Sequence, residues 1–334
     1  MHSPTQSMKA ALVETIGGPF RMVERPRPVP GPGEVLVRIH ASGVNPLDTK
    51  IRAGAAEHAR HALPAILGLD LAGVVAAVGP EVTGFKPGDE VFGMTGGVGG
   101  IPGTLAEYAA VDARLLAIKP AALTMWEAAA LPLVTITAWE GLVDRARIQP
   151  NQTLLVQGGA GGVGHVAVQI GRAFGARVFA TGNASSAEVI RSLGAEPIDY
   201  ATVPVQEQVA RHTGGEGFDV VYDTGGGAIL DASFLAVKRF GHVVSALGWG
   251  THSLAPLSFK GATYSGVFTL APLLTGIGRA HHGEILAQAA ALAEAGKLRP
   301  RVDPRVFTLE TVAEAHAAVA AGSAAGKVVV SVAA

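Results

Sequence analysis

A glycine-rich turn between an apolar strand and a helical segment constrains this chain more than any other feature. Residues 153–164 read TLLVQGGAGGVG, and the pattern continues as HVAVQIGRAFG. Gly159, Gly161 and Gly164 stand at the spacing G-x-G-x-x-G. In a strand–turn–helix unit, such glycines permit the tight turn, the approach of backbone amides to a pyrophosphate and close helix–strand packing. The segment predicts a dinucleotide site. The alternative is a glycine turn that binds nothing.

Strand patterns alternate with helical patterns on both sides of that helix. The expected strands are Leu154–Gln157, Arg177–Thr181, Val220–Tyr222, His242–Ala246 and Thr263–Thr269. Such alternation predicts right-handed βαβ units and a parallel sheet.

The part of the chain before Thr124 carries short strand patterns separated by glycine and proline turns. They lie at Met8–Val13, Glu34–Ile39, Val74–Val78, Glu90–Phe92 and Gly103–Val111. This part is therefore expected to be β-rich. A last helix is expected at Gly283–Gly296, and a last strand at Lys327–Val332.

Composition narrows the classes of protein to which the chain can belong. Of its 334 residues, 49% are hydrophobic and 16% are charged, and its net charge is −1. Such a chain can fold around a large core, and it has no basic excess for nucleic acid or anionic lipid. It contains no cysteine, which excludes disulfides and thiolate metal sites. The start, MHSPTQSMKA, lacks an apolar signal core, so we expect a cytoplasmic protein without a membrane span.

Several motifs resemble one family from Met8 to the C-terminal end. They include SGVNPLDTKIRAG, LPAILGLDLAGVV, VTGFKPGDEVFG and GTLAEYAAV in the first part, and the glycine turn, FDVVYDTGGG and GKVVVSV in the remainder. In this order they are similar to the medium-chain dehydrogenase/reductase superfamily, in its zinc-independent quinone oxidoreductase (zeta-crystallin-like) group. The resemblance implies an α/β protein with a β-rich GroES-like catalytic domain over residues 1–123 and 272–334. It also implies a Rossmann dinucleotide-binding domain with a doubly wound parallel sheet over 124–271, and an active site in the cleft.

The positions that hold zinc in zinc-dependent relatives carry other residues here. Asn45-Pro46 stands where those relatives have a cysteine, and Gly68-Leu69-Asp70 replaces their Gly-His-Glu motif. A mixed His/Asp site is chemically possible, but nothing in the sequence gathers such ligands. We therefore expect no catalytic metal.

The end of the second Rossmann strand bears on the choice between NADPH and NADH. NAD-preferring sites place an acid there, which hydrogen-bonds the ribose 2′-OH. This chain has Asn183, Ser185 and Ser186 instead, and the first acid, Glu188, falls in the next helix. These residues favour NADPH, although relatives often have a lysine near position 186, and NADH stays possible. Including positions implied by the resemblance, the residues expected at the cofactor are Thr137, Gly159, Gly161, Gly162, Val163, Gly164, Thr181, Asn183, Ser185, Ser186, Tyr200, Leu247, Gly248, Phe268 and Lys327. For Lys327, membership of the last strand is an alternative explanation.

Two residues are expected at the reacting end. The resemblance places Asn45 beside the nicotinamide, where its amide could orient a substrate carbonyl or a ribose hydroxyl; alternatively it caps the turn before Pro46. Lys50 stands where many relatives have tyrosine. Its ammonium could stabilise negative charge on the acceptor oxygen or supply a proton. Alternatively, Lys50 is a solvated lysine or pairs with Asp48 or Asp70.

These observations predict a zinc-independent, NADPH-dependent oxidoreductase that transfers hydride to a quinone or an α,β-unsaturated carbonyl. Alternatives are a 2-alkenal, enone or enoyl-thioester reductase, and a nucleotide-binding sensor with little turnover. The expected partners are a small electron acceptor and further copies of the chain in a homodimer or tetramer. The resemblance implies a homodimer formed through edge strands around Thr263–Thr269. No nucleic-acid or membrane partner is expected.

Overall fold

The computed structural model describes residues 6–333 as two compact units. Unit 1 comprises residues 1–133, 270–295 and 300–334, and unit 2 comprises 134–269 and 296–299. The first division falls inside helix α3 (Pro132–Trp139), which continues into a π-helical turn, η3 (Glu140–Arg145). The sequence analysis divided the chain at 123/124 and 271/272.

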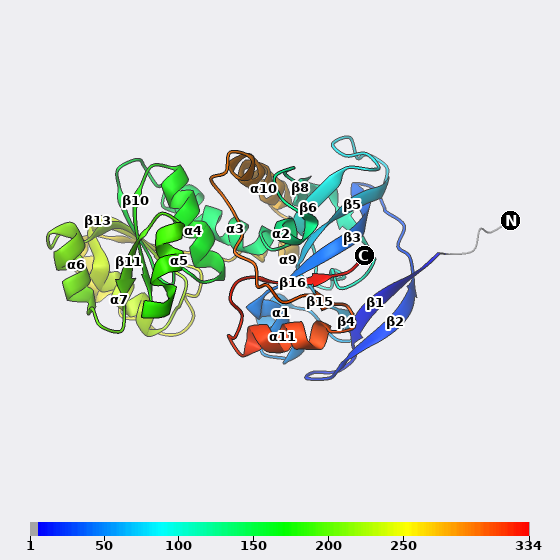
Figure 1. The fold of residues 1–334 in the computed structure, drawn as a ribbon, viewed down its shortest axis with the longest axis horizontal. Helices are drawn as coiled ribbons and strands as arrows, with labels where there is room; N and C mark the ends of the chain where they lie inside the picture. The colour runs from blue at the N-terminus through cyan, green and yellow to red at the C-terminus, as the bar shows by residue number, and fades with distance from the viewer. Residues whose placement is uncertain (1–5, 334) are drawn as a thin grey trace. The chain divides into compact units, whose positions relative to one another are not determined.

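Unit 2 is a six-stranded sheet whose neighbouring strands are all parallel (Figure 1). Its strands are β9 (Thr153–Val156), β10 (Arg177–Gly182), β11 (Glu196–Asp199), β12 (Phe218–Asp223), β13 (Val237–Ser245) and β14 (Thr263–Gly266). Its helices are α4 (Gly162–Ala173), α5 (Ala187–Ser192), α6 (Val205–Thr213), α7 (Ala228–Ala236) and α8 (Ala255–Lys260), with a 3-10 turn, η4 (Ala184–Ser186). The fold is thus the Rossmann-like α/β arrangement expected from the alternating patterns.

The strand order is β11-β10-β9-β12-β13-β14. Successive strands step outward from β9 in one direction and from β12 in the other, so the order reverses between these two strands. In open parallel sheets, ligands bind outside the carboxyl ends of the strands at such a reversal. A ligand of unit 2 is therefore expected to bind at the segments that follow Val156 and Asp223.

Buried side chains on and around the strands form the core of unit 2. One cluster joins Leu155, Phe179, Phe218 and Val221 to Phe234 from α7. The central strands β9, β10 and β12 are mostly apolar and buried, because a parallel sheet covered by helices is buried on both faces.

Unit 1 contains a seven-stranded sheet and a separate three-stranded sheet. The larger sheet has the path β15-β16-β3-β5-β6-β8, with β7 also paired to β3, and the smaller one has the order β2-β1-β4. The strands are β1 (Ser7–Val13), β2 (Phe20–Pro26), β3 (Glu34–Val44), β4 (Ala65–Ile66), β5 (Asp70–Val78), β6 (Glu90–Met94), β7 (Tyr108–Asp112), β8 (Leu116–Ile118), β15 (Phe307–Thr308) and β16 (Val328–Ser331). Its helices besides the start of α3 are α1 (Pro46–Arg52), α2 (Met125–Ala129), α9 (Ala271–Thr275), α10 (Arg279–Glu294) and α11 (Val312–Ala320), with 3-10 turns η1 (Glu57–Ala59) and η2 (Ala113–Leu115).

Both ends of the chain contribute to the large sheet of unit 1. Strand β16 pairs antiparallel with β3, with Val328 opposite Val44 and Ser331 opposite Ala41. The last expected strand thus belongs to the β-rich unit, and it completes a sheet whose other long strands precede residue 120.

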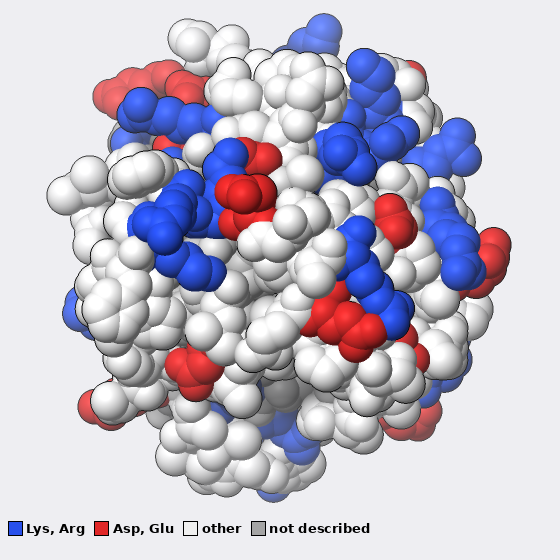
Figure 2. Space-filling model, turned by 90° about the vertical axis from the view of Figure 1, so that its left-hand side faces the viewer, with Lys and Arg blue, Asp and Glu red and all other residues white. Residues whose placement is uncertain are grey.

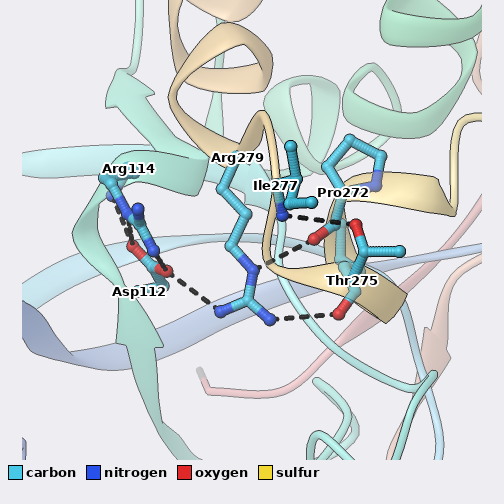
Figure 3. A network of polar contacts seen from close by, with 7 residues as sticks. Asp112, Arg114, Pro272, Thr275, Ile277 and Arg279 are labelled. Carbon is cyan, nitrogen blue, oxygen red and sulfur yellow. Dashed lines mark hydrogen bonds and ion pairs between the residues drawn. The ribbon is translucent and has the colours of Figure 1, made fainter.

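The side chain of Arg279, the first residue of α10, joins residues 270–295 to the N-terminal part of unit 1 (Figure 3). It donates to Asp112 Oδ2 at 3.0 Å and to the carbonyls of Pro272 and Leu273 at 3.2 and 3.0 Å. Partial burial would raise the pKa of Asp112, but hydrogen bonds from Arg114 and Arg279 hold it below the usual value. The start of α10 is therefore tied to the end of β7 and to α9.

Five strands, β2, β4, β8, β11 and β15, escaped the sequence analysis, and β5 and β13 begin four and five residues earlier than expected. Strand β2 is largely exposed and charged, and β11 is short and contains Pro197. Strand β5 begins at Asp70, four residues before the expected start at Val74. No helix among residues 6–333 combines the length and the apolar character that crossing a membrane would require.

Candidate functional site

The glycine loop after β9 lies at the reversal of the unit 2 sheet. Gly158 has φ +74°, a conformation that favours glycine, so it provides the tight turn. A Cβ on Gly164 would lie 2.0 Å from the Gly158 carbonyl oxygen, and one on Gly159 would lie 2.4 Å from Ala180 Cβ. The sequence analysis identified the close packing but missed Gly158 as the turn residue.

Helix α4 begins at this loop without a side-chain cap. Its N-cap is Gly161, and no side-chain hydrogen bond closes the helix start. The first-turn amides, from Gly162, Val163 and Gly164, therefore have no side-chain acceptor at the positive end of a twelve-residue helix. Amides in this arrangement can bind a phosphate or pyrophosphate group.

A buried polar network holds the loop from below. The Thr181 hydroxyl donates to Gln157 Oε1 at 2.8 Å and accepts from the Gly158 amide at 3.0 Å. The Thr224 hydroxyl donates to the Gln157 carbonyl at 2.6 Å. Thr181 was expected at the cofactor, and the structure places its hydroxyl in the support of the glycine loop.

Asp223 organises a second glycine turn beside the first. Its carboxylate accepts from the amides of Gly225 and Gly226 at 3.0 Å and from the Ser245 hydroxyl at 2.6 Å. The side chain is fully buried. The sequence analysis missed this residue, although an acid that ends an apolar strand directly before TGGG was the available signal.

The end of β10 carries the polar residues expected near the adenosine. Asn183 caps η4: its Oδ1 accepts from the Ser186 amide at 3.0 Å and from the Ser185 hydroxyl at 2.8 Å. The Ser186 hydroxyl donates to the Asn183 carbonyl at 2.9 Å. Both serine hydroxyls thus donate within the turn. Of the three side chains, Asn183 is therefore the one whose donor group, Nδ2, is left to bind a ligand. Tyr200 is exposed, and its amide donates to the Gly182 carbonyl at 3.2 Å.

The other expected cofactor residues of unit 2 lie in two places. The Thr137 and Thr269 hydroxyls are 2.9 Å apart, and the Thr137 carbonyl accepts from the buried Tyr222 hydroxyl at 2.7 Å. Leu247 and Gly248 follow β13, where the Leu247 amide donates to Ser245 Oγ at 3.0 Å. Phe268 packs edge-on against Trp249, with ring centroids 6.2 Å apart.

Unit 1 holds a buried polar cluster around Asn45. The Asn45 Nδ2 group donates to Asp70 Oδ2 at 2.9 Å, and its Oδ1 accepts from the Lys327 ammonium. Lys327 Nζ also lies 3.4 Å from the Val44 carbonyl oxygen and 3.9 Å from Asp70 Oδ2. The Asn45 amide is thus engaged by two charged side chains. The turn at Pro46 is closed by Asp48, whose Oδ2 accepts from the Asn45 backbone amide at 2.8 Å.

Burial shifts the titration of all three charged groups in this cluster. It raises the pKa of Asp48 to about 7 and the pKa of Asp70 to about 6, while the Lys327 charge opposes both shifts. It lowers the pKa of Lys327, which the charges of Asp70 and Asp48 partly offset. Asp48 Oδ1 is buried and has no hydrogen-bond partner among the described residues. The cluster therefore exchanges protons more readily near neutral pH than solvated carboxylates would.

Lys50 and Lys327 lie in different surroundings. Lys50 is exposed on α1, and its ammonium makes no hydrogen bond or ion pair with any residue in 6–333. The possible pairing of Lys50 with Asp48 or Asp70 is therefore not observed. Lys327 was expected at the cofactor, with membership of the last strand as the alternative; its side chain is buried in unit 1 and bound by groups of that unit. A lysine engaged in this way has no exposed ammonium to offer to a phosphate.

Comparisons with known proteins agree with this architecture. Residues 31–121 match the alcohol dehydrogenase GroES-like domain, and residues 193–330 match a family described as zinc-binding dehydrogenase. A crystal structure of an alcohol dehydrogenase superfamily protein from Novosphingobium aromaticivorans has 62% identity and a TM-score of 0.96, and the match covers 98% of this chain and 100% of that one.

Two curated plant enzymes are similar over 305 residues each. The 2-methylene-furan-3-one reductase of Solanum lycopersicum is 37% identical, and the match covers 89% of this chain and 71% of that protein. The NADPH-dependent alkenal/one oxidoreductase of Arabidopsis thaliana, a chloroplastic protein, is 35% identical over 89% of this chain and 72% of its own length. The chain therefore belongs to the medium-chain dehydrogenase/reductase superfamily of NAD(P)H-using oxidoreductases, in its quinone-oxidoreductase-like group.

Proposed function

We propose that the protein is an NADPH-dependent reductase of α,β-unsaturated carbonyl compounds, with quinones as further acceptors. The observation that carries the proposal is the uncapped glycine start of α4 at the reversal of the parallel sheet, which suits a dinucleotide pyrophosphate. The names of the two plant relatives support unsaturated carbonyls as the substrate class.

The residues present fit a nicotinamide dinucleotide. The first-turn amides of α4 would hold the pyrophosphate, while Thr181 and Gln157 keep the loop in place. When bound, NADPH supplies the hydride for reduction of the acceptor. After hydride reaches the β-carbon of an enone, negative charge resides on the carbonyl oxygen and a proton must reach the α-carbon. Lys50 is the proposed electrostatic partner of that oxygen.

NADPH is the proposed cofactor because the end of β10 offers an amide and no carboxylate. Asn183 Nδ2 can donate to a 2′-phosphate, whereas an acid at this position would repel it. Asp199 pairs with Gly182 from the neighbouring strand, and its Oδ1 already accepts from the Ala201 amide at 2.9 Å.

The proposed mechanism contains no zinc, because the donors in unit 1 do not fit that ion. Zinc is bound mainly by cysteine sulfur and histidine nitrogen, and the sequence contains no cysteine. The two oxygens of Asp70 already accept from Asn45 and from the Leu133 amide, and Leu69 beside it is apolar. Among residues 6–333, no three His, Cys, Asp or Glu side chains gather as a metal site would require.

A second copy of the chain is the proposed protein partner. Strand β14 is at the edge of the unit 2 sheet, where backbone N–H and C=O groups can pair with a strand of another chain. Large apolar side chains are also exposed in unit 2, including Phe240 (85% exposed) and Phe259 (82% exposed). Nucleic acid is not a proposed partner, because basic and acidic side chains are interspersed on the face drawn in Figure 2.

The test of the function is oxidation of NADPH and NADH, followed by absorbance, against four acceptors with and without a chelator. The acceptors are 1,4-benzoquinone, 9,10-phenanthrenequinone, an alkyl enone and a simple saturated aldehyde. We expect chelator-resistant turnover of the enone with NADPH, slower or comparable turnover of quinones, and none of the aldehyde. Cofactor binding without turnover of any acceptor would favour the alternative of a nucleotide-binding sensor.

A further inference from the structure

The buried lysine of the Asn45 cluster is not accounted for by the proposed reaction. Lys327 directly precedes β16, and its backbone is fixed by hydrogen bonds to Arg301 and Asp303 at 2.7 and 2.9 Å. Its side chain is 5% exposed and reaches the Val44 carbonyl, Asn45 and Asp70. Burying an ammonium is costly unless it is paired. Lys327 is nevertheless buried, and its partners are Asn45 and Asp70.

The charges around Asn45 determine which way its amide faces. Lys327 can only donate hydrogen bonds, and an ionised Asp70 can only accept them. The oxygen of Asn45 must therefore face Lys327, and its nitrogen must face Asp70, as the structure has them. A rotated amide would place NH₂ against the ammonium and oxygen against the carboxylate.

This orientation leaves a defined donor. One Nδ2 hydrogen of Asn45 is used by Asp70, and the other has no acceptor among the residues that the structure describes. The ammonium at Oδ1 withdraws electron density from the amide, which makes the remaining N–H a stronger donor.

In this cluster the ammonium of Lys327 lies against oxygen atoms that could otherwise bind a metal ion. Asn45 Oδ1 and Asp70 Oδ2 are oxygen atoms that could face a metal ion, but both face the ammonium of Lys327. The ammonium supplies one positive charge 3.9 Å from Asp70 Oδ2, and this charge also acts on the buried Asp48.

We propose that Lys327 is a positioning residue for hydride transfer: its ammonium fixes the orientation of the fully buried Asn45 amide, leaves one Nδ2–H without an acceptor among residues 6–333, and counters the charge of Asp70. The inference rests on the proposed function for its kinetic consequence, and on the contact between Lys327 and Asn45 for its structural one. If Lys327 bound the cofactor phosphate instead, its substitution would raise the Kd for NADPH and preserve kcat.

The kinetic test is a double-mutant cycle of Lys327→Met and Asn45→Ala with the alkyl enone and NADPH. We expect each single variant to lower kcat about 10- to 100-fold, and the double variant to be no slower than Asn45→Ala, because both changes remove one function. The Kd for NADPH should stay within about threefold of wild type. Multiplicative losses, or a large rise in the NADPH Kd with kcat preserved, would overturn the proposal.

Two further variants separate positioning from folding. Lys327→Met leaves Asp70 as an unpaired buried charge, so the pair Lys327→Met/Asp70→Asn restores neutrality and should fold while staying slow. The matched control is Lys119→Met, because Lys119 is also buried in unit 1 and donates to the carbonyls of Pro120 and Leu123. The control should lose stability with kcat unchanged. An equal loss of kcat in Lys119→Met would count against a specific role for Lys327.

An independent readout does not need turnover. The chain has three asparagines, Asn45, Asn151 and Asn183, so selective ¹⁵N-asparagine labelling gives three side-chain NH₂ pairs in an NMR spectrum. We expect the Asn45 pair, identified by its absence in Asn45→Ala, to shift in Lys327→Met while the other two stay in place. An unshifted Asn45 pair would refute the contact. A shifted pair in an enzyme that reduces no acceptor would support the contact and refute the proposed function.

Discussion

Asn183 is the residue at which cofactor choice can be tested most directly. Asn183→Asp keeps an oxygen that caps η4 but places a negative charge where the 2′-phosphate is proposed to bind. We expect the preference for NADPH over NADH to fall at least about tenfold, or about 1.4 kcal/mol. The Kd values for both cofactors measure this. Ser192→Asp, which adds the same charge at the end of α5, is the control, and an unchanged preference in Asn183→Asp would contradict the assignment.

Lys50 is exposed, and its ammonium has no ion-pair partner among residues 6–333, so its proposed role at the acceptor oxygen would depend on charge. Replacing it with methionine removes the charge and keeps much of the side-chain length. We expect Lys50→Met to lower kcat/KM on the enone about tenfold or more, with the NADPH Kd unchanged. Lys50→Arg should recover much of the loss. Full kcat/KM in Lys50→Met would show that the residue has no role in the transition state.

Asp48 gives the fold a pH dependence that opposes ordinary acid denaturation. Its pKa is raised from 3.8 to about 7 by burial, so the folded state holds a proton that the unfolded state releases between these values. The wild type therefore loses this part of its stability as pH rises from about 4 to 7, by at most about 1.4 kcal/mol per pH unit. Asp48→Asn keeps an oxygen for the Asn45 amide and has no charge to desolvate.

The prediction for Asp48→Asn is a stability difference that grows with pH. Urea unfolding at pH 5 and pH 8 should show the variant gaining on the wild type by roughly 1–3 kcal/mol between the two values. A difference that is the same at both pH values would mean that Asp48 does not titrate in this range.

At the scale of elements, Arg279 links the start of α10 to the nearby helix α9 and to the end of β7, which is distant in sequence. Arg279→Met would leave the Pro272 and Leu273 carbonyls without this donor and Asp112 without one of its two arginines. We expect a loss of about 1–3 kcal/mol in the free energy of unfolding, measured by urea unfolding with circular dichroism. Arg21→Met, which removes a solvent-exposed pair with Glu14, should cost at most about 1 kcal/mol. Equal losses would show that the Arg279 contacts contribute nothing beyond a surface ion pair.

Patterns local in sequence predicted much of this fold, and contacts distant in sequence account for what they missed. The glycine turn and the apolar strands of unit 2 are local signals, and the structure has β9, α4 and β10 within three residues of them. The Asn45 cluster unites residues 45, 70 and 327, so no local period could reveal it. Its signal was chemical: a lysine in an apolar strand pattern suggests a buried partner.

Strand β2 shows the converse limit. Residues Phe20–Pro26 carry alternating charges and little apolar surface, and their pairing with β1 is made by the backbone. Side-chain patterning cannot reveal a strand whose faces are both largely exposed. Gly158 was missed for a different reason: its importance lies in a positive φ, which the G-x-G-x-x-G spacing does not encode.

At the scale of the whole molecule, the edge of the unit 2 sheet can be blocked with one substitution. The Val267 amide donates to the Ser245 carbonyl, and because amides alternate along a strand, the Gly266 amide faces the open edge. Gly266→Pro removes that donor without removing a hydrogen bond inside the sheet. We expect the wild type to sediment as a dimer and Gly266→Pro to shift toward monomer, with Gly266→Ala as the matched control. Identical sedimentation of all three would contradict pairing through β14.

The pairing of β16 with β3 sets an order of events during protein synthesis. Residues 134–269 leave the ribosome as one nearly complete unit, whereas β3 waits for a partner strand made almost 290 residues later, counting from Val44 to Val328. A nascent chain can thus complete its nucleotide-binding sheet while its other sheet is still open. Lys327 arrives with β16, so the positive charge at Asn45 is made after all the other strands of unit 1. Until then Asp48 and Asp70 lack this counter-charge, so the polar cluster around Asn45 can be completed only after residue 327 has been made.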